Sequence, residues 1–439
     1  MKIVLSLNYV IKEDRMKKIA LSAAIALIPF TTVFAKTSYI VKLKDNAPES
    51  MAAMLTNDQT TAKNIPVKFG RFIKLESDAP VAEMIQLPEN VSEIEYIEPS
   101  QTYYPIDFHQ GEQVDIMDSQ YGSQWGLKNT GRNSGGWWSR GKAGEDINAE
   151  KAWTVTKGSR AIKVAVIDTG VDYNHPDLKD QMWTNTAELN GQPGVDDDGN
   201  GYVDDIHGYD FQNKDGDPMD DHNHGTHCAG VIGASHNSIG IKGVMADVEI
   251  VAIKFLSARG GTTEDAILSV QYAIDVGVDV MSNSWGGGGF SQALKDAIIA
   301  ANNAGIVFVA AAGNSNSDND ARPTYPTNYE VDNVIAVGSH TGKGTRSSFS
   351  NYGAKTVHVM APGSGILSTV RGGKYANMSG TSMACPHVSG IAGLLLSVEP
   401  NLTPAEVRDR MVNTAKGSSS LKSTSLGGRI DAYEMLITK

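Results

Sequence analysis

Three polar residues with complementary chemistry lie far apart along this chain of 439 residues. Asp168 ends the apolar run Val-Ala-Val-Ile, His224 opens the small-residue stretch His-Gly-Thr-His-Cys-Ala-Gly, and Ser382 lies in Gly-Thr-Ser-Met-Ala-Cys-Pro-His. An imidazole can take the proton of a serine hydroxyl, and a buried carboxylate can fix the tautomer of that imidazole. These residue types therefore predict nucleophilic catalysis at Ser382.

The surrounding sequence places each of the three residues where a strand or loop meets a helix. The apolar run before Asp168 predicts a buried strand that delivers the carboxylate at its C-terminal end, where open α/β sheets hold their sites. The apolar run after Ser382 predicts a helix whose first N–H groups face the hydroxyl and a developing oxyanion. Ser382 alone is equally compatible with an N-cap. The other two segments favour catalysis.

The segments Asp-Thr-Gly-Val-Asp, His-Gly-Thr-His and Gly-Thr-Ser-Met-Ala-Cys-Pro-His resemble the three signatures of subtilisin-like serine proteases, in that family's order. A chance match to one motif is plausible, but three in order are specific. The stretch Ala-Ala-Ala-Gly-Asn also resembles a family segment, which implies that the Asn314 amide donates to the oxyanion beside the Ser382 N–H. The bare sequence also allows a turn asparagine at this position.

The segment Ser284-Trp285-Gly286-Gly287 resembles the part of the family that binds substrate. The resemblance implies that this edge pairs with the substrate backbone as an added strand, that the glycines admit the peptide and that Trp285 walls a side-chain pocket. The glycine run is also compatible with a flexible loop, but not with a phosphate loop, because no G-x-G-x-x-G follows the first strand. We expect protein or peptide substrates and a broad, apolar-biased preference.

An acidic segment predicts a calcium site. Oxygen ligands recur at alternate positions around a glycine turn, at Asp196, Asp198, Asn200, the Tyr202 carbonyl and Asp204, with Asp205 as an additional ligand. The twelfth position is His207 rather than a bidentate glutamate, which argues against a true EF-hand. A solvated acidic loop is the alternative, but clustered carboxylates repel one another without a cation.

The family resemblance implies a second calcium site. Its ligands would be Asp177 in Asn-His-Pro-Asp-Leu, Asn237 and Ile239 in Asn-Ser-Ile-Gly, and Asp118 from the N-terminus of the mature protein. A cation there would clamp distant segments and stabilise the folded state. Zinc is not expected, because His-Gly-Thr-His is not the His-Glu-x-x-His motif.

The remaining candidate ligands are expected to be structural. His227 should support the fold and His222 should be a loop residue. The chain has two cysteines, Cys228 and Cys385, each about one helical turn after a catalytic candidate. A disulfide is the alternative for an exported protein, but both lie in small-residue helices, which favours two buried thiols. A cysteine nucleophile is not favoured, because the motif places Ser382 at the reactive position.

The composition and the N-terminal residues indicate the partners and the location of the protein. The net charge of −12 disfavours nucleic acid or an anionic membrane as partner. Residues 16–35 have two lysines, an apolar core too short to span a membrane, and a small-residue cleavage pattern, which together predict a secretory signal. Residues 1–15 fit a signal badly, which favours Met16 as the start. We expect a secreted protein, monomeric, with no membrane attachment once the signal is removed.

Two further regions follow the signal region 1–35. Residues 36–105 predict a small α+β domain that resembles the family's propeptide, an intramolecular inhibitor and folding helper, and the tail 100–113 would be cut within about ten residues of Phe108. Residues 106–439 alternate strands and helices, which predicts an α/β catalytic domain with a mainly parallel central sheet between two helical layers. The resemblance implies a self-processed serine endopeptidase. The alternative is a catalytically silent peptide-binding member, and a lipase-type esterase is excluded because Gly-x-Ser-x-Gly is missing.

Overall fold

The computed structural model describes residues 36–78, 93–106, 109–110, 120–132, 140–416 and 419–439. The predicted secretory signal, residues 79–92 of the predicted α+β domain and the calcium ligand predicted at Asp118 lie outside these residues. Residues 36–439 form one compact unit.

The N-terminal part of the described chain is a four-stranded antiparallel sheet in the order β2-β3-β1-β4. Its elements are β1 (Thr37–Leu43), α1 (Met51–Met54), β2 (Thr60–Ile65), β3 (Arg71–Ser77) and β4 (Ile94–Pro99). Apolar side chains from β1, β3 and α1 form its core, among them Val41, Met51 and Leu75. The α+β character predicted for this region is therefore confirmed.

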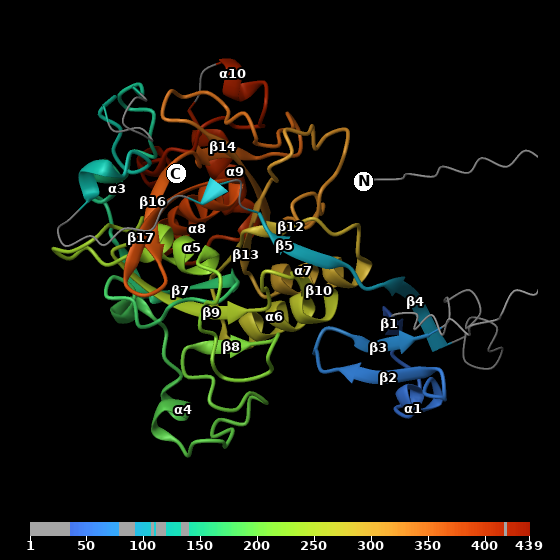
Figure 1. Cartoon of the computed structure of the whole chain (residues 1–439). Helices are drawn as coiled ribbons and strands as arrows, with labels where there is room; N and C mark the ends of the chain where they lie inside the picture. Colours follow the sequence, from blue (N-terminus) through green and yellow to red (C-terminus); the bar gives the residue numbers. More distant parts are fainter. Residues whose placement is uncertain (1–35, 79–92, 107–108, 111–119, 133–139, 417–418) are drawn as a thin grey trace, which may run out of the picture. The chain divides into compact units, whose positions relative to one another are not determined.

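A seven-stranded parallel sheet forms the centre of the remaining chain, in the order β15-β14-β13-β11-β7-β9-β8 (Figure 1). Its strands are β7 (Gly158–Asp168), β8 (Gly208–Asp210), β9 (Asp247–Lys254), β11 (Val280–Asn283), β13 (Val307–Ala311), β14 (Val334–His340) and β15 (Val359–Pro362). All six neighbouring pairs run parallel. Such a sheet must be covered on both faces.

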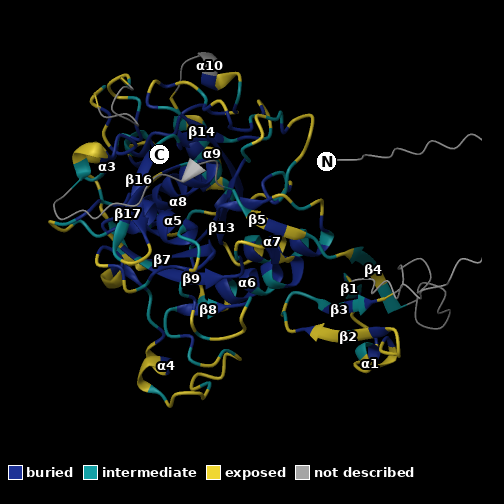
Figure 2. Ribbon diagram, viewed as in Figure 1, coloured by how far each residue is buried: buried dark blue, intermediate teal, exposed yellow. Residues whose placement is uncertain are grey.

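Alternate side chains of β7 enter two different cores. Val164 and Val166 pack with α5 (His224–Gly233) and α8 (Thr381–Val398), whereas Ala165 and Ile167 pack with α6 (Thr263–Val276) and α7 (Gln292–Asn303). This period of two explains why residues 164–167 of the strand are all apolar. Figure 2 shows the central strands and α8 as buried. The predicted α/β fold with three layers is confirmed.

Shorter elements complete the chain. The helices are α3 (Ala149–Ala152), α4 (Thr186–Asn190), α9 (Pro404–Thr414), α10 (Ser419–Lys422) and α11 (Ala432–Ile437), and the 3-10 turns are Tyr121–Ser123 and Lys179–Gln181. The short strands are β5 (Thr102–Pro105), β6 (His109–Gln110), β10 (Gly261–Thr262) and β12 (Trp285–Gly286), with the hairpin β16 (Ile366–Val370) and β17 (Lys374–Ser379).

Local sequence signals fix several helix ends. Thr403 and Glu406 form a capping box ahead of α9, with Pro404 in the first turn, and Thr262 and Asp265 form another ahead of α6. Among the described residues, α8 is the one helix long and apolar enough to cross a membrane, but 89% of that stretch is buried inside the protein. It is therefore the core helix of this fold, and it carries Ser382.

Candidate active site

Asp168 and His224 form a buried pair at the C-terminal end of strand β7 in the central sheet. Asp168 is the last residue of β7, and its carbonyl accepts the N–H groups of Phe255 and Leu256, which follow β9. His224 begins α5, and its Nδ1 lies 2.7 Å from Asp168 Oδ1. Both side chains are fully buried. A carboxylate at Nδ1 favours the tautomer in which Nε2 is the basic nitrogen.

Ser382 is the second residue of α8, and Cys228 lies between it and this pair. The carboxylate, imidazole and thiol of Asp168, His224 and Cys228 lie within 4.8 Å of one another, and Cys228 Sγ is 3.5 Å from the Ser382 carbonyl oxygen. The Ser382 hydroxyl contacts two carbonyl oxygens, that of Ile106 and, at 3.0 Å, that of Ser284. The fold therefore gathers Asp168, His224 and Ser382 in one buried region.

Asn314 follows β13 and faces the same point. Its Nδ2 donates to the Ile106 carbonyl oxygen at 3.0 Å, while its Oδ1 accepts from the N–H of Thr381 at 2.9 Å and from the Thr381 hydroxyl at 3.0 Å. The two bonds to Thr381 fix the direction of the amide. The Ile106 carbonyl is thus contacted by both the Ser382 hydroxyl and the Asn314 amide.

The chain's own strand β5 leads into this position. It pairs antiparallel with β10 on one side and with β12 on the other, so that Tyr103 lies opposite Gly261 and Pro105 lies opposite Trp285. The N–H of Ile106 donates to the Ser284 carbonyl at 3.0 Å. The edge predicted at Ser284–Gly287 therefore does receive an extended segment. The opposite edge at β10 was missed, because two residues between loops carry no strand signal of their own.

The glycines of this edge make room for the segment. A Cβ at Gly286 would lie 2.9 Å from Ile106 Cδ1, and one at Gly288 would lie 2.5 Å from Tyr103 Cε1. Tyr103 is fully buried, with its ring 5.2 Å from that of Trp285, which the sequence predicts as a pocket wall. Phe255 packs on the same indole at 4.9 Å. The groove thus takes an aromatic side chain three residues before Ile106.

The backbone beyond Ile106 is also paired. β6 runs antiparallel to β17, with His109 opposite Ser379 and Gln110 opposite Met378. Because Ser379 lies three residues before Ser382, a bound chain is held by strand pairing on both sides of the Ile106 carbonyl.

The acidic segment brings carboxylates together, and it includes a residue that sequence reasoning missed. Oxygens of Glu188, Asp196 and Asp198 lie within 4.8 Å of one another. Glu188 belongs to α4 and accepts the N–H groups of Asp197, Asp198 and Asp204. No local motif includes it, since it lies outside the repeating pattern. These hard oxygen donors fit calcium better than zinc or copper.

The other predicted ligands of this loop have partners of their own. Asp205 is buried and accepts from Asn185, Asn200 and the Tyr272 hydroxyl, at 2.8, 3.1 and 2.6 Å. Burial raises the pKa of Asp205 to about 6. Asp204 accepts from the Gly194 N–H at 2.8 Å, and the Tyr202 ring packs 4.8 Å from that of Tyr272. Of the ligands predicted in this loop, Asp196 and Asp198 lie in the cluster with Glu188.

Residues predicted for the second calcium site contact one another. Asp177 is fully buried, and its oxygens accept from Asn237 Nδ2 at 2.9 Å, the Ile241 N–H at 3.0 Å and the Tyr375 hydroxyl at 2.9 Å. The side-chain oxygen Oδ1 of Asn237 accepts the Ile239 N–H at 2.9 Å. Three of the four predicted ligands therefore lie on neighbouring segments.

The cysteines and the second histidine of the motif are structural. Cys228 and Cys385 are free and buried, which confirms the prediction of two thiols. Burial raises the pKa of both, that of Cys385 to about 11, so neither is a thiolate nucleophile at neutral pH. His227 Nε2 lies 3.0 and 3.1 Å from the carbonyls of Ile366 and Ala376, and burial lowers its pKa to about 3.

Comparisons with known proteins agree with this geometry. The model of the subtilase family matches residues 159–429. The chain is 42% identical over 291 residues to a thermophilic serine proteinase of Bacillus sp. (strain AK1), covering 66% of this chain and 65% of that protein. It is 39% identical over 292 residues to thermitase of Thermoactinomyces vulgaris, covering 66% of this chain and 93% of that protein.

A further relative is subtilisin-like protease 1 of Plasmodium berghei (strain Anka), 37% identical over 296 residues, or 63% of this chain and 49% of that protein. The chain thus spans less than two thirds of the length of the Bacillus and Plasmodium relatives. The family match extends over more than half of the chain and contains Asp168, His224, Asn314 and Ser382. The chain belongs to the subtilase family, the subtilisin-like serine proteases.

Proposed function

We propose that this chain is a serine endopeptidase made as a zymogen, and that its first substrate is its own bond between Ile106 and Asp107. One observation carries the proposal: the Ile106 carbonyl oxygen lies against the Ser382 hydroxyl and 3.0 Å from the Asn314 amide. The Asp168–His224 pair lies beside them. The boundary between prosegment and mature enzyme then falls after Ile106, one residue beyond the domain boundary predicted at 105 and within about ten residues of Phe108, where the sequence predicts the cut.

In the proposed reaction, His224 takes the hydroxyl proton as Ser382 Oγ attacks the Ile106 carbonyl carbon. The negative charge that develops on the carbonyl oxygen is stabilised by the Asn314 amide. Asp168 orients the imidazole and stabilises its cationic form. The bond to the Asp107 nitrogen breaks, His224 protonates the leaving amine, and water then hydrolyses the acyl-enzyme at Ser382. Other peptides would follow the same route along β10 and β12.

Contacts of the N-terminal sheet support its role as an intramolecular inhibitor. The Glu98 carboxylate accepts from the Ser291 hydroxyl at 2.6 Å and from the N–H groups of Gln292 and Ala293 at 2.7 and 3.1 Å, so it caps the start of α7. Lys42 pairs with Asp296 on the same helix at 2.7 Å. These contacts hold β5 in the groove, where it excludes other substrates.

Calcium binding and export complete the proposal. Glu188, Asp196 and Asp198 would hold a calcium ion, and Asp177 with the Asn237–Ile239 loop would hold a second. Bound calcium would neutralise the clustered carboxylates and stabilise the folded enzyme. Export is supported by the signal-like residues 16–35. We expect a monomeric, secreted enzyme.

A serine-directed fluorophosphonate tests the activity directly. The purified wild-type chain should be labelled at Ser382, as located by peptide mass spectrometry, and the Ser382→Ala variant should not be labelled. A matched Ser389→Ala variant, which changes a serine on the same helix, should be labelled like the wild type. A wild-type chain that is folded, free of its prosegment and unlabelled would instead be a silent peptide-binding member of the family.

A further inference from the structure

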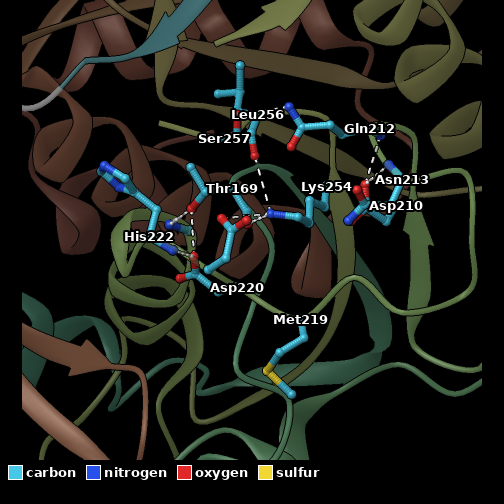
Figure 3. A network of polar contacts seen from close by, with 12 residues as sticks. Thr169, Asp210, Gln212, Asn213, Met219, Asp220, His222, Lys254, Leu256 and Ser257 are labelled. Carbon is cyan, nitrogen blue, oxygen red and sulfur yellow. Dashed lines mark hydrogen bonds and ion pairs between the residues drawn. The ribbon is translucent and has the colours of Figure 1, made fainter. Parts of the chain in front are cut away.

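A second buried carboxylate is linked through Thr169 to the Asp168–His224 pair, and the proposed reaction does not use it. Asp220 is fully buried and lies in the loop that leads to His224 (Figure 3). We propose, on the basis of the proposed function, that Asp220 is a positioning residue that fixes Asp168 and His224 relative to one another. Burial of a carboxylate is costly unless it is fully hydrogen-bonded, so its partners indicate what it holds in place.

Asp220 accepts five hydrogen bonds. One oxygen accepts from the Thr169 hydroxyl at 2.9 Å and from the N–H groups of His222 and Asn223 at 2.8 and 3.0 Å. The other accepts from the N–H and the hydroxyl of Thr226 at 3.0 and 2.6 Å. The donors thus come from the turn after β7, from the two residues before α5 and from the first turn of α5.

Thr169 connects Asp220 to the catalytic carboxylate. Thr169 follows Asp168 directly, and its N–H donates to Asp168 Oδ1 at 2.7 Å, which is the oxygen that faces His224 Nδ1. The Thr169 hydroxyl donates to Asp220 and accepts the Gly225 N–H at 2.9 Å. One hydroxyl therefore links Asp220, the turn after Asp168 and the residue after His224.

Asp220 also replaces the missing cap of α5. The N-cap residue Asn223 has a left-handed backbone, with φ of 91°, and its side chain makes no capping hydrogen bond. The first N–H groups of the helix are satisfied instead by Thr169, at Gly225, and by Asp220, at Thr226. A carboxylate at a helix N-terminus is electrostatically favourable. The start of the helix, and with it His224, is held by the same group that holds Thr169.

A buried cation fixes the opposite side of the turn. Lys254 Nζ donates to the Thr169 carbonyl at 2.9 Å and pairs with Asp221 Oδ1 at 2.9 Å (Figure 3). Thr169 is therefore held through its hydroxyl by Asp220 and through its carbonyl by Lys254. Small errors in the placement of catalytic groups are expensive, since a shift of about 1 Å can cost roughly 10²-fold in rate.

The test is Asp220→Asn, measured on the self-processed protein. The amide keeps the shape but turns one acceptor into a donor, so the five bonds cannot all remain. We expect kcat on a peptide substrate to fall between about 10- and 100-fold with KM unchanged, and the downfield proton resonance of His224 Nδ1–H to shift or broaden. A role in stability alone would lower the melting temperature and leave both readouts unchanged.

A matched control is Asp210→Asn. Asp210 is also fully buried, at the end of β8, and accepts from Gln212 and Asn213 within its own turn. This variant should lose stability without losing kcat. If kcat were the same in Asp220→Asn and Asp210→Asn, the inference about Asp220 would be wrong and the proposed function would stand. An inactive, unlabelled wild type would overturn both the proposed function and the inference.

A second pair of variants decides the matter if Asp220→Asn does not fold. Thr169→Ser keeps the hydroxyl that joins Asp220 to Gly225 and should keep kcat within about twofold, whereas Thr169→Val removes it and should reproduce the loss. Wild-type kcat in Thr169→Val would contradict the proposed link.

Discussion

The catalytic cluster and the acidic loop at 196–205 gather polar groups in opposite ways. Asp168 and His224 are 56 positions apart in sequence, fully buried, and held by partners from several segments. The acidic loop is local, largely exposed, and folded by bonds from its own backbone, such as those of Asn200 and Gly201 to Asp196. Contacts between distant segments fix the geometry of the catalytic cluster, whereas the geometry of the acidic loop depends on a group that neutralises its carboxylates. Damage to one region should therefore leave the other intact.

The largest expected difference between the two regions is the difference in kcat between Asp168→Asn and Asp196→Asn. The first should lower kcat by about 10⁴-fold, the loss expected when a triad imidazole is left in the wrong tautomer. The second should change kcat little and should weaken calcium-dependent stability. Rates of prosegment cleavage and melting temperatures with and without calcium measure both. Equal loss of activity in the two variants would show that the regions are not independent.

Within the catalytic cluster, Asn314→Ala tests the amide that faces the Ile106 carbonyl. Loss of one oxyanion donor should reduce kcat by about 10²- to 10³-fold with little change in KM. Steady-state kinetics on a peptide substrate measures the effect. The side chain also accepts from Thr381, so Thr381→Val is the control: it removes the hydroxyl, with its bonds to Asn314 and Gly313, and keeps the backbone bond to Asn314. A larger loss in the control than in Asn314→Ala would assign the effect to the start of α8.

Chelation of calcium should act on stability through the acidic loop. If calcium binds only the folded chain, its removal from a concentration 100 times the Kd costs about 2.7 kcal/mol of unfolding free energy. Glu188→Gln should remove most of the calcium-dependent part, as measured by thermal unfolding with and without chelator. Asp180→Asn, which changes an exposed carboxylate outside the cluster, should respond to chelator like the wild type. Unchanged calcium dependence in Glu188→Gln would place the ion elsewhere.

The smallest effect concerns Asp205. Because burial raises the pKa of Asp205 to about 6 from an ordinary 3.8, the folded state binds this proton more tightly than the unfolded state. Its contribution to the unfolding free energy therefore falls as the pH rises from about 4 to about 6. Asp205→Asn should remove that slope in calcium-free denaturant titrations. A slope unchanged by the substitution would assign it to another group.

Sequence reasoning was most successful where one segment carries its own signal. The alternation of strands and helices over residues 106–439 predicted the parallel sheet between helical layers that the structure has. The apolar run before Asp168 predicted a strand of the parallel sheet, and the three family motifs located the residues that the fold brings together. The thiol state of Cys228 and Cys385 followed from their small-residue helices.

What sequence reasoning missed depends on contacts between distant segments. The strand β10 has two residues, and it exists because it pairs with the four-residue strand β5, which β12 holds on its other side. Glu188 joins the acidic cluster through the backbone of a loop that folds back on α4. Asp220 precedes His224 by four positions, but its importance appears only when Thr169 is seen beside it.

The intact masses of the purified full chain and its Ser382→Ala variant test the central claim most directly. The wild type should yield two products, a prosegment that ends at Ile106 and an enzyme that begins at Asp107, while Ser382→Ala should remain in one piece. Cleavage of Ser382→Ala after Ile106 by the protein alone, or a folded wild type that never cuts this bond, would contradict the account.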